Sequence, residues 1–357
     1  MRKNKRILML VNWQLRYSKE DIPDEQLPNK VVEGKRYWFF RHWDEEELSV
    51  DVVDFTRLFG VHTIEKRFLK FYVSQALRVL PNLDCYSLIM SHSAQSGVFL
   101  AFLRTLLGKR TPPHIIIDPG SFNGGRDRIL ELLPIRMCLS SVAGIIGHSS
   151  SQVPFYTHTL CLTPDRFRIV HVGVDTDFYS QDGTACVEDY VVCTGYMKRD
   201  WNTLLGAWRQ IEQGSELLIV GREGLGRGMA GVRCMPYVSR SRLKEVISRA
   251  RFVVLPLPYY TYSFGQMSLL IAQALGKAVI VTRVPGLLDY VEDGKTALLV
   301  DPYDVEDMRS KMAFLLSNPQ MADELGREAR KAVVSRYSEK QMSLGLKDAV
   351  DELLKNT

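Results

Sequence analysis

The sequence has no long apolar run, no closely spaced cysteine pair and little net charge. None of its apolar stretches reaches the roughly 18 residues of a membrane-spanning helix. The N-terminus lacks the apolar segment and cleavage site of a secretory signal. The six cysteines form no C-x-x-C pair, which argues against zinc binding and a disulfide framework. A net charge of +5 is too small to predict nucleic-acid binding. We therefore expect a cytoplasmic protein.

The 357 residues, 46% of them hydrophobic, are enough for two globular domains of roughly 150 residues each. Short runs that are apolar on both faces alternate with amphipathic stretches, which is typical of parallel sheets covered by helices on both sides. The expected strands are 7–11, 50–55, 87–90, 115–117, 145–146, 190–193, 217–220, 252–257 and 278–282. They predict an α/β protein of two facing, doubly wound, Rossmann-like domains. The predicted boundaries are 1–178, 179–338 and a C-terminal helix within 339–357.

Ligands of doubly wound sheets bind beyond the carboxyl ends of the strands. In the second half, Gly195 follows a strand, and Lys198 and Arg199 precede the next helix. A glycine turn, two cations and a helix N-terminus together favour bound phosphate, because free backbone N–H groups and the helix dipole attract negative charge. The alternative interpretation is an ordinary solvated helix start.

The most specific pattern lies in Pro256–Pro302. A tyrosine-rich loop is followed by Ser263-Phe264-Gly265-Gln266, a helix ending in Gly276-Lys277, and Glu292-Asp293-Gly294. This run resembles the C-terminal signature of family-4 retaining glycosyltransferases, which have the GT-B fold. The segments His171–Tyr179 and Val191–Trp208 are similar to two further motifs of that family. The resemblance covers most of residues 142–338, whereas residues 1–141 agree only in their pattern of strands and helices.

The resemblance implies a nucleoside-diphosphate-sugar donor bound in the second half. Its diphosphate is expected on the amides of Ser263, Phe264, Gly265 and Gln266. The family's two cations fall on Tyr196 and Arg199, so Lys198 is the candidate replacement for the lost one. The family's paired glutamates fall on Ser263 and Ile271, and isoleucine cannot accept a hydrogen bond.

Two further consequences of the resemblance concern the ribose and the C-terminus. Because Ile271 cannot bind the donor ribose, that role is expected for Glu292 or Gln273. The last helix is expected to cross back onto the N-terminal domain, as in other GT-B enzymes.

The first half carries the candidate acceptor residues. The long loop after the first strand, 12–35, leads into a segment of aromatic and basic side chains, 36–43. Aromatic rings pack on the apolar faces of sugars, and cations bind phosphate, so a sugar or isoprenoid phosphate would suit such a site. An amphipathic core helix is the alternative for 36–43. The candidate acceptor-binding residues are Asn12, Trp13, Trp38, Ser121 and Asn123.

His92 and Asp118 are the candidate catalytic residues. His92 stands at the carboxyl end of a predicted strand, although a histidine there can also be purely structural. Asp118 is the carboxylate that directly follows the next strand, where it could bind the acceptor or stabilise the sugar cation.

Two other patterns allow competing interpretations. Asp175-Thr176-Asp177 imitates a metal-binding motif, but short acidic residues also cap turns, so no metal is expected. The segments 66–72 and 126–140 mix cations with bulky apolar residues. They could lie on the inner face of an anionic membrane, or be core helices with snorkelling cations.

These observations predict a retaining hexosyltransferase without a cofactor. It would move a hexose from a nucleotide sugar to a glycan, a lipid-linked or a small-molecule acceptor. Two alternatives remain open at this point. They are a nucleotide-sugar epimerase of the same architecture and a non-catalytic nucleotide-sugar-binding protein.

Overall fold

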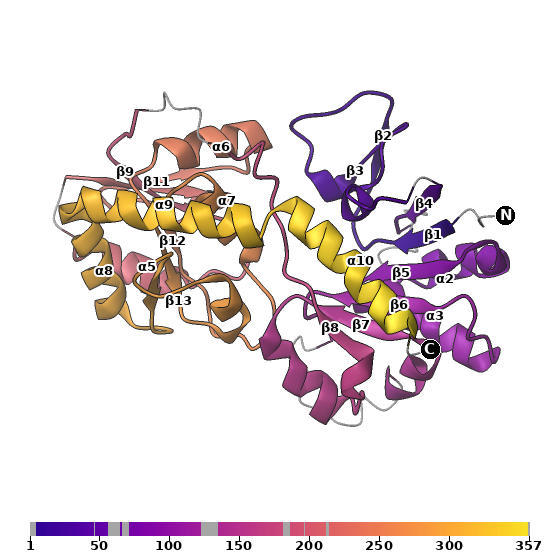
Figure 1. Cartoon of the computed structure of the whole chain (residues 1–357). Coiled ribbons are helices and arrows are strands. Elements are labelled where there is room, and N and C mark those ends of the chain that lie inside the picture. The colour runs from indigo at the N-terminus through magenta and orange to yellow at the C-terminus, as the bar shows by residue number, and fades with distance from the viewer. Residues whose placement is uncertain are drawn as a thin grey trace. The chain divides into compact units, whose positions relative to one another are not determined.

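The computed structural model describes residues 5–45, 47–55, 65, 71–122, 135–180, 186–195, 197–211 and 214–355. The chain divides into two compact units (Figure 1). Unit 1 comprises Met1–His171 and Met342–Thr357, and unit 2 comprises Val172–Gln341.

Unit 1 is built on a six-stranded parallel sheet in the order β4-β1-β5-β6-β7-β8. The strands are β1 (Lys5–Leu10), β4 (Leu48–Val53), β5 (Leu88–His92), β6 (His114–Asp118), β7 (Gly144–Gly147) and β8 (Phe167–Ile169). The central strands are apolar on both faces because helices cover both. Leu8 and Leu10 pack against α2 (Val73–Val79) and α3 (Ser93–Leu106), and the alternate residues Ile7 and Met9 pack on the α10 side.

The last helix, α10 (Glu339–Lys355), packs on the sheet of unit 1 through Leu346 and Val350 (Figure 1). The indole N–H of Trp43 donates to the carbonyl of Ser343 at 2.9 Å. The alternative interpretation of 36–43 as a core helix is wrong in form, because only a 3-10 turn, Trp38–Phe40, occurs there. The long loop after β1 also forms a small parallel pair, β2 (Arg16–Ser18) with β3 (Lys30–Val32).

Unit 2 repeats the architecture with the strand order β11-β10-β9-β12-β13-β14, again all parallel. The strands are β9 (Tyr190–Thr194), β10 (Glu216–Val220), β11 (Val232–Met235), β12 (Val253–Leu255), β13 (Val279–Thr282) and β14 (Leu298–Val300). The helices are α5 (Trp201–Trp208), α6 (Arg240–Arg249), α7 (Gln266–Ala274), α8 (Val305–Ser317) and α9 (Pro319–Arg336).

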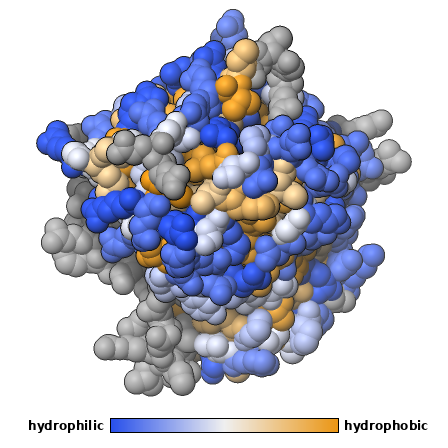
Figure 2. Space-filling view, turned by 90° about the vertical axis from the view of Figure 1, so that its left-hand side faces the viewer, coloured by the Kyte–Doolittle hydropathy of each residue, from blue (hydrophilic) through white to orange (hydrophobic). Residues whose placement is uncertain are grey.

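Both sheets confirm the prediction of two doubly wound, Rossmann-like domains. In each sheet the strand order reverses beside its first strand, between β1 and β5 in unit 1 and between β9 and β12 in unit 2. Such switch points are where ligands of this fold class bind. The face shown in Figure 2 is largely hydrophilic, with hydrophobic residues in scattered patches. Among the described helices, none combines the length and hydropathy that crossing a bilayer requires.

Candidate functional site

Arg199 lies at the switch point of unit 2, in the loop between β9 and α5. Its side chain is buried, with 9% of the residue exposed. It donates to the carbonyls of Thr194 at 3.0 Å and Met197 at 3.1 Å, and to the hydroxyl of Ser268 at 2.9 Å. Burial lowers the pKa of Arg199, and no carboxylate of the described residues forms an ion pair with it. Arg199 is therefore a buried cation without a counter-charge among the residues that the structure describes.

Gly195 gives Arg199 the space to occupy this position. It has a φ of 100°, which favours glycine. A Cβ atom at residue 195 would stand 2.3 Å from Nη2 of Arg199. The glycine that sequence analysis assigned to phosphate binding therefore also makes room for the guanidinium group.

The first turn of α7 is brought to Arg199 by Ser268. Gly265 precedes this helix with a φ of 90°, and the side chain of Gln266 donates to the carbonyl of Gly286 at 2.8 Å. Gly286 is itself pressed against the chain before the turn, since a Cβ there would lie 2.0 Å from the carbonyl oxygen of Tyr262. The turn is thus held rigidly, with the unpaired N–H groups of a helix start beside a buried cation.

Lys198 lies next to this turn, and three aromatic side chains surround its ammonium group. Its ammonium is 4.9 Å from the ring centre of Tyr260, 4.7 Å from that of Tyr262 and 5.0 Å from that of Phe264. It also donates to the hydroxyl of Tyr262 at 2.5 Å. Ring faces attract cations at such distances, so the tyrosine-rich loop holds a second positive charge next to the Ser263–Gln266 turn.

The structure does not join Glu292 to these groups. Its carboxylate is paired with Lys295 at 2.7 Å and Arg336 at 2.9 Å. No contact links it to Arg199 or the first turn of α7 within the described chain. Gln273, the other residue considered for the ribose, donates to the carbonyl of Thr296 at 3.2 Å. Ser268 was missed by sequence analysis, and only its place in the first turn of α7 could have suggested it.

At the switch point of unit 1, the structure brings together three predicted residues, Asn12, Trp13 and His92. Nδ1 of His92 lies 3.1 Å from Oδ1 of Asn12, and its ring contacts that of Trp13 at 4.7 Å between centres. Burial lowers the pKa of His92 to about 3, so the imidazole is neutral at neutral pH. The next residue, Ser93, has a φ of 69°, a conformation that costs a non-glycine residue about 1–2 kcal/mol.

His148 joins this group, although sequence analysis missed it. It follows β7, and its ring centre is 6.4 Å from that of His92. Its Nδ1 lies 2.7 Å from the carbonyl of Val170, and burial lowers its pKa to about 4. Its position just beyond the predicted strand 145–146 is the signal that could have identified it.

The prediction that Asp118 follows the strand is wrong, because Asp118 is the last residue of β6 and has no exposed surface. Its carboxylate accepts hydrogen bonds from the backbone N–H of Ser121 at 2.7 Å, the Ser121 hydroxyl and the Tyr156 hydroxyl. Burial raises the pKa of Asp118 to about 6. The Ser121 hydroxyl in turn accepts from the backbone N–H of Ala94 at 2.7 Å. Asp118 therefore fixes the loop after β6 against the start of α3.

The surroundings of the other predicted acceptor residues differ from one residue to the next. Trp38 is buried in the core of unit 1, with 7% exposed, against Phe39 at 4.7 Å. It is thus not a surface platform for a sugar. Trp13 is half-buried, and its indole donates to the carbonyl of Pro28 at 2.6 Å. Asn123 lies outside the described residues.

Asp175 has a structural role in the described chain. Its carboxylate pairs with Arg240 at 2.8 Å and accepts from the backbone N–H of Phe178 at 3.0 Å. The described residues contain no cluster of three or more side chains able to hold a metal ion.

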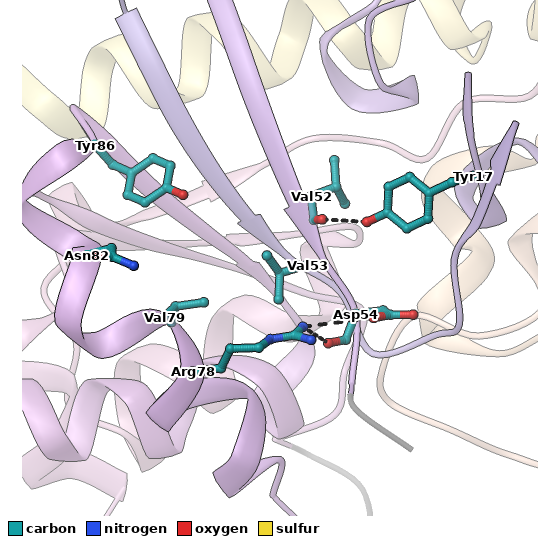
Figure 3. Close-up of a pocket in the computed structure, with 8 residues that line it drawn as sticks. All are labelled: Tyr17, Val52, Val53, Asp54, Arg78, Val79, Asn82 and Tyr86. Carbon is teal, nitrogen blue, oxygen red and sulfur yellow. Dashed lines mark hydrogen bonds and ion pairs between the residues drawn. The ribbon is translucent and has the colours of Figure 1, made fainter. Parts of the chain in front are cut away.

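A pocket of 380 Å³ lies at the carboxyl end of β4, and none of the residues predicted for the site is among its lining residues (Figure 3). Its lining residues are Tyr17, Val52, Val53, Asp54, Arg78, Val79, Asn82 and Tyr86.

Comparison with known sequences shows that unit 2 is similar to glycosyltransferases. Residues 188–318 match the family model described as Glycosyl transferases group 1. A segment of 106 residues is 34% identical to a D-inositol 3-phosphate glycosyltransferase of Nocardioides, covering 30% of this chain and 22% of that protein. A segment of 85 residues is 32% identical to the capsular polysaccharide biosynthesis glycosyltransferase CapM of Staphylococcus aureus, covering 24% of this chain and 22% of that protein. The aligned segments thus span about a fifth of these relatives.

Solved structures extend the similarity in fold to nearly the whole chain. Sucrose-phosphate synthase from Thermosynechococcus elongatus superposes with a TM-score of 0.76 at 16% identity, covering 99% of this chain and 100% of that one. HepE of Anabaena in complex with UDP-glucose gives a TM-score of 0.69 at 14% identity, covering 97% and 99%. The predicted GT-B fold is confirmed, and the match to the group 1 family model confirms the predicted resemblance of the second half to glycosyltransferases.

Proposed function

We propose that the chain is a glycosyltransferase that moves a hexose from a nucleoside-diphosphate sugar to an acceptor with retention of configuration. The observation that carries this proposal is Arg199, a buried cation beside the first turn of α7 that has no counter-charge within the described part of the chain. A bound diphosphate would supply the missing negative charge. It would also accept hydrogen bonds from the turn, and arginine suits phosphate because its donors form a planar fork.

The group 1 match over residues 188–318 supports a nucleotide-sugar donor in unit 2. HepE, which shares the fold, has been solved with UDP-glucose. In this proposal Arg199, Lys198 and the Ser263–Gln266 turn stabilise the charge that develops on the departing diphosphate. Glu292 is the proposed partner of the ribose hydroxyls. To bind them, its carboxylate would have to give up its ion pairs with Lys295 and Arg336.

Unit 1 is proposed to bind a glycan, a lipid-linked or a small-molecule acceptor. Asn12, Trp13 and His92 are the proposed acceptor-contacting group, because they meet at the switch point. Asp118 is proposed as a positioning residue that holds Ser121, since its carboxylate is fully engaged inside the sheet.

The experiment is a screen of UDP-, GDP-, ADP- and dTDP-sugars, first for binding by calorimetry and then for turnover with added glycosides. Product analysis by NMR gives the configuration of the new linkage, and retention is expected. Conversion of the donor to an epimer without an acceptor would support the epimerase instead. Binding without turnover across acceptors would support a non-catalytic protein, and no nucleotide binding at all would refute the proposal.

We also propose a peripheral contact of unit 1 with an anionic membrane. Leu106, Leu107 and Met137 are 67%, 56% and 70% exposed. A hydrogen bond of 3.4 Å from the Thr105 hydroxyl to the Cys138 carbonyl joins the two segments that carry them. The exposed cation Arg110 follows the same helix. Exposed apolar side chains beside a cation suit a surface of anionic lipid. Segments 66–72 and 126–140, which first suggested this contact, lie largely outside the described residues.

The membrane contact is tested by sedimentation with vesicles of phosphatidylcholine alone or mixed with phosphatidylglycerol. Replacing Leu106 and Met137 by glutamate should abolish binding to the anionic vesicles. Leu288→Glu, at a 45% exposed position of unit 2, is the matched control. Equal binding by all variants would contradict the contact.

A further inference from the structure

The pocket at the end of β4 is lined by side chains that the proposed mechanism does not use. Figure 3 shows Tyr17 and Tyr86 on opposite sides of it, with Val53 and Val79 between them and Arg78 reaching towards Asp54. Its volume of 380 Å³ falls within the roughly 300–1,000 Å³ of small-molecule sites. Since β4 is the edge strand of the sheet, the pocket lies at the border of unit 1.

The charges of the pocket are balanced. Arg78 donates to the backbone carbonyl of Asp54 at 2.8 Å and lies 3.9 Å from its carboxylate. Next to the pocket, the Tyr86 hydroxyl donates to Asp51 at 2.8 Å, and Asp51 is paired with Arg6 at 2.7 Å. Two cations thus face two carboxylates, so the pocket offers no excess charge to an anion or a cation. The occupant should be neutral.

The pocket nevertheless keeps hydrogen-bonding capacity. The Asn82 amide, with two donors and one acceptor, has no partner among the described residues. Arg78 uses only part of its five donors. Between these groups lie the valine side chains and the tyrosine rings. A neutral ligand with several hydroxyls and an apolar face matches this mixture, and a saccharide has both.

The pocket also shares a chain segment with the group around His92. Asp54 accepts from the backbone N–H of Leu15 at 3.1 Å, and the Tyr17 hydroxyl donates to the carbonyl of Val52 at 2.9 Å. Leu15 belongs to the same loop as Asn12 and Trp13, and Tyr17 lies in β2, directly after this loop. At the base of this loop, the Gln75 amide donates to the carbonyls of both Val11 and Val53 at 2.9 Å. The connection between β1 and β2 therefore borders both the pocket and the group around His92.

We propose that this pocket binds a neutral saccharide unit through Asn82, Arg78 and the two tyrosine rings. If the proposed function holds, on which this second step rests, the unit is a sugar of the acceptor other than the one that reacts. The acceptor would then be a glycan of at least two sugars or a glycosylated lipid.

The test is saturation-transfer NMR on the full-length protein without nucleotide. The probes are the methyl glycosides of glucose, galactose, mannose and N-acetylglucosamine, with inorganic phosphate as the anionic contrast. The variants are Asn82→Leu and Arg78→Met. Asn202→Leu, at an exposed position of α5 in unit 2, is the matched control. We expect at least one glycoside to bind, with affinity at least about tenfold weaker in both pocket variants, as loss of one hydrogen bond of about 1.4 kcal/mol implies.

The proposal is overturned if no glycoside binds the wild-type protein or if binding persists in both pocket variants. It is also overturned if phosphate, and no glycoside, competes for the pocket. Asn82→Leu is expected to keep the fold, because Asn82 is exposed. A loss of binding in this variant is therefore not explained by misfolding. A parallel UDP titration separates the two proposals. UDP binding without glycoside binding contradicts only the pocket, and the reverse contradicts only the proposed donor site.

Discussion

Replacing Arg199 by methionine gives the most direct test of the donor site. The change removes the guanidinium group but keeps a side chain that can pack in the same buried space. A hydrogen bond to a charged group contributes about 1.5–3 kcal/mol. If the diphosphate is the counter-charge of Arg199, UDP should therefore bind about 10- to 100-fold more weakly to Arg199→Met.

The comparison of three ligands assigns the loss to the phosphates. We expect calorimetry to show a large loss for UDP, a smaller one for UMP and none for uridine. Arg199→Lys should recover part of the loss, because lysine restores the charge but not the planar fork. Arg209→Met, at an exposed position of unit 2, should bind like the wild type. Circular dichroism of each variant establishes that the fold is retained.

Two results would refute the reasoning. One is a folded Arg199→Met variant that binds UDP within about twofold of the wild type. The other is an equal loss for UDP and uridine, which would mean that Arg199 shapes the site without meeting the phosphates.

Three further predictions concern Lys198, Asp118 and the two histidines His92 and His148. Lys198→Met should weaken UDP binding, and Tyr262→Phe should weaken it less because the ring remains while the hydrogen bond of 2.5 Å is lost; calorimetry measures both. Asp118→Ala should lower the free energy of unfolding in urea by about 3 kcal/mol, because it leaves buried donors unsatisfied. In the folded state the pKa of His92 is about 3 and that of His148 is about 4. Each histidine should therefore lower the free energy of unfolding by about 2 kcal/mol at pH 5 relative to pH 7. The reason is that the unfolded histidines, with a pKa near 6.5, take up protons and the folded ones do not until the pH falls to their own pKa. Urea denaturation at the two pH values should show a smaller difference for His148→Gln.

The strands of both sheets could be predicted because burial on two faces leaves a simple signal. Runs such as 7–11 and 279–281 are apolar at every position, and only a strand covered by helices requires that. The pair β2 and β3 could not be predicted, since each has three residues and most of them are exposed or half-buried. The turn at Trp38–Phe40 was misjudged because its aromatic residues face the core without a helical period.

In the candidate site, the backbone conformation could be predicted where glycine determines it. Gly195 and Gly265 both adopt positive φ, and the glycine pattern was the signal that identified them. Pairs of residues that meet only through side-chain contacts were harder to predict. Nothing in the sequence places Ser268 against Arg199, or commits the carboxylate of Glu292 to Arg336.

The two switch points differ in how their polar groups are satisfied, and this difference bears on their roles. In unit 1, His92 meets Asn12, and Asp118 meets Ser121 and Tyr156, so these side chains find their partners within the fold. In unit 2, Arg199 is also buried but has no negative partner in the described chain. A buried charge without a counter-charge costs several kcal/mol, and a fold retains it where a ligand offsets that cost. The proposed diphosphate would offset that cost in unit 2, whereas the internal pairs of unit 1 fix the orientation of the side chains that are proposed to contact the acceptor.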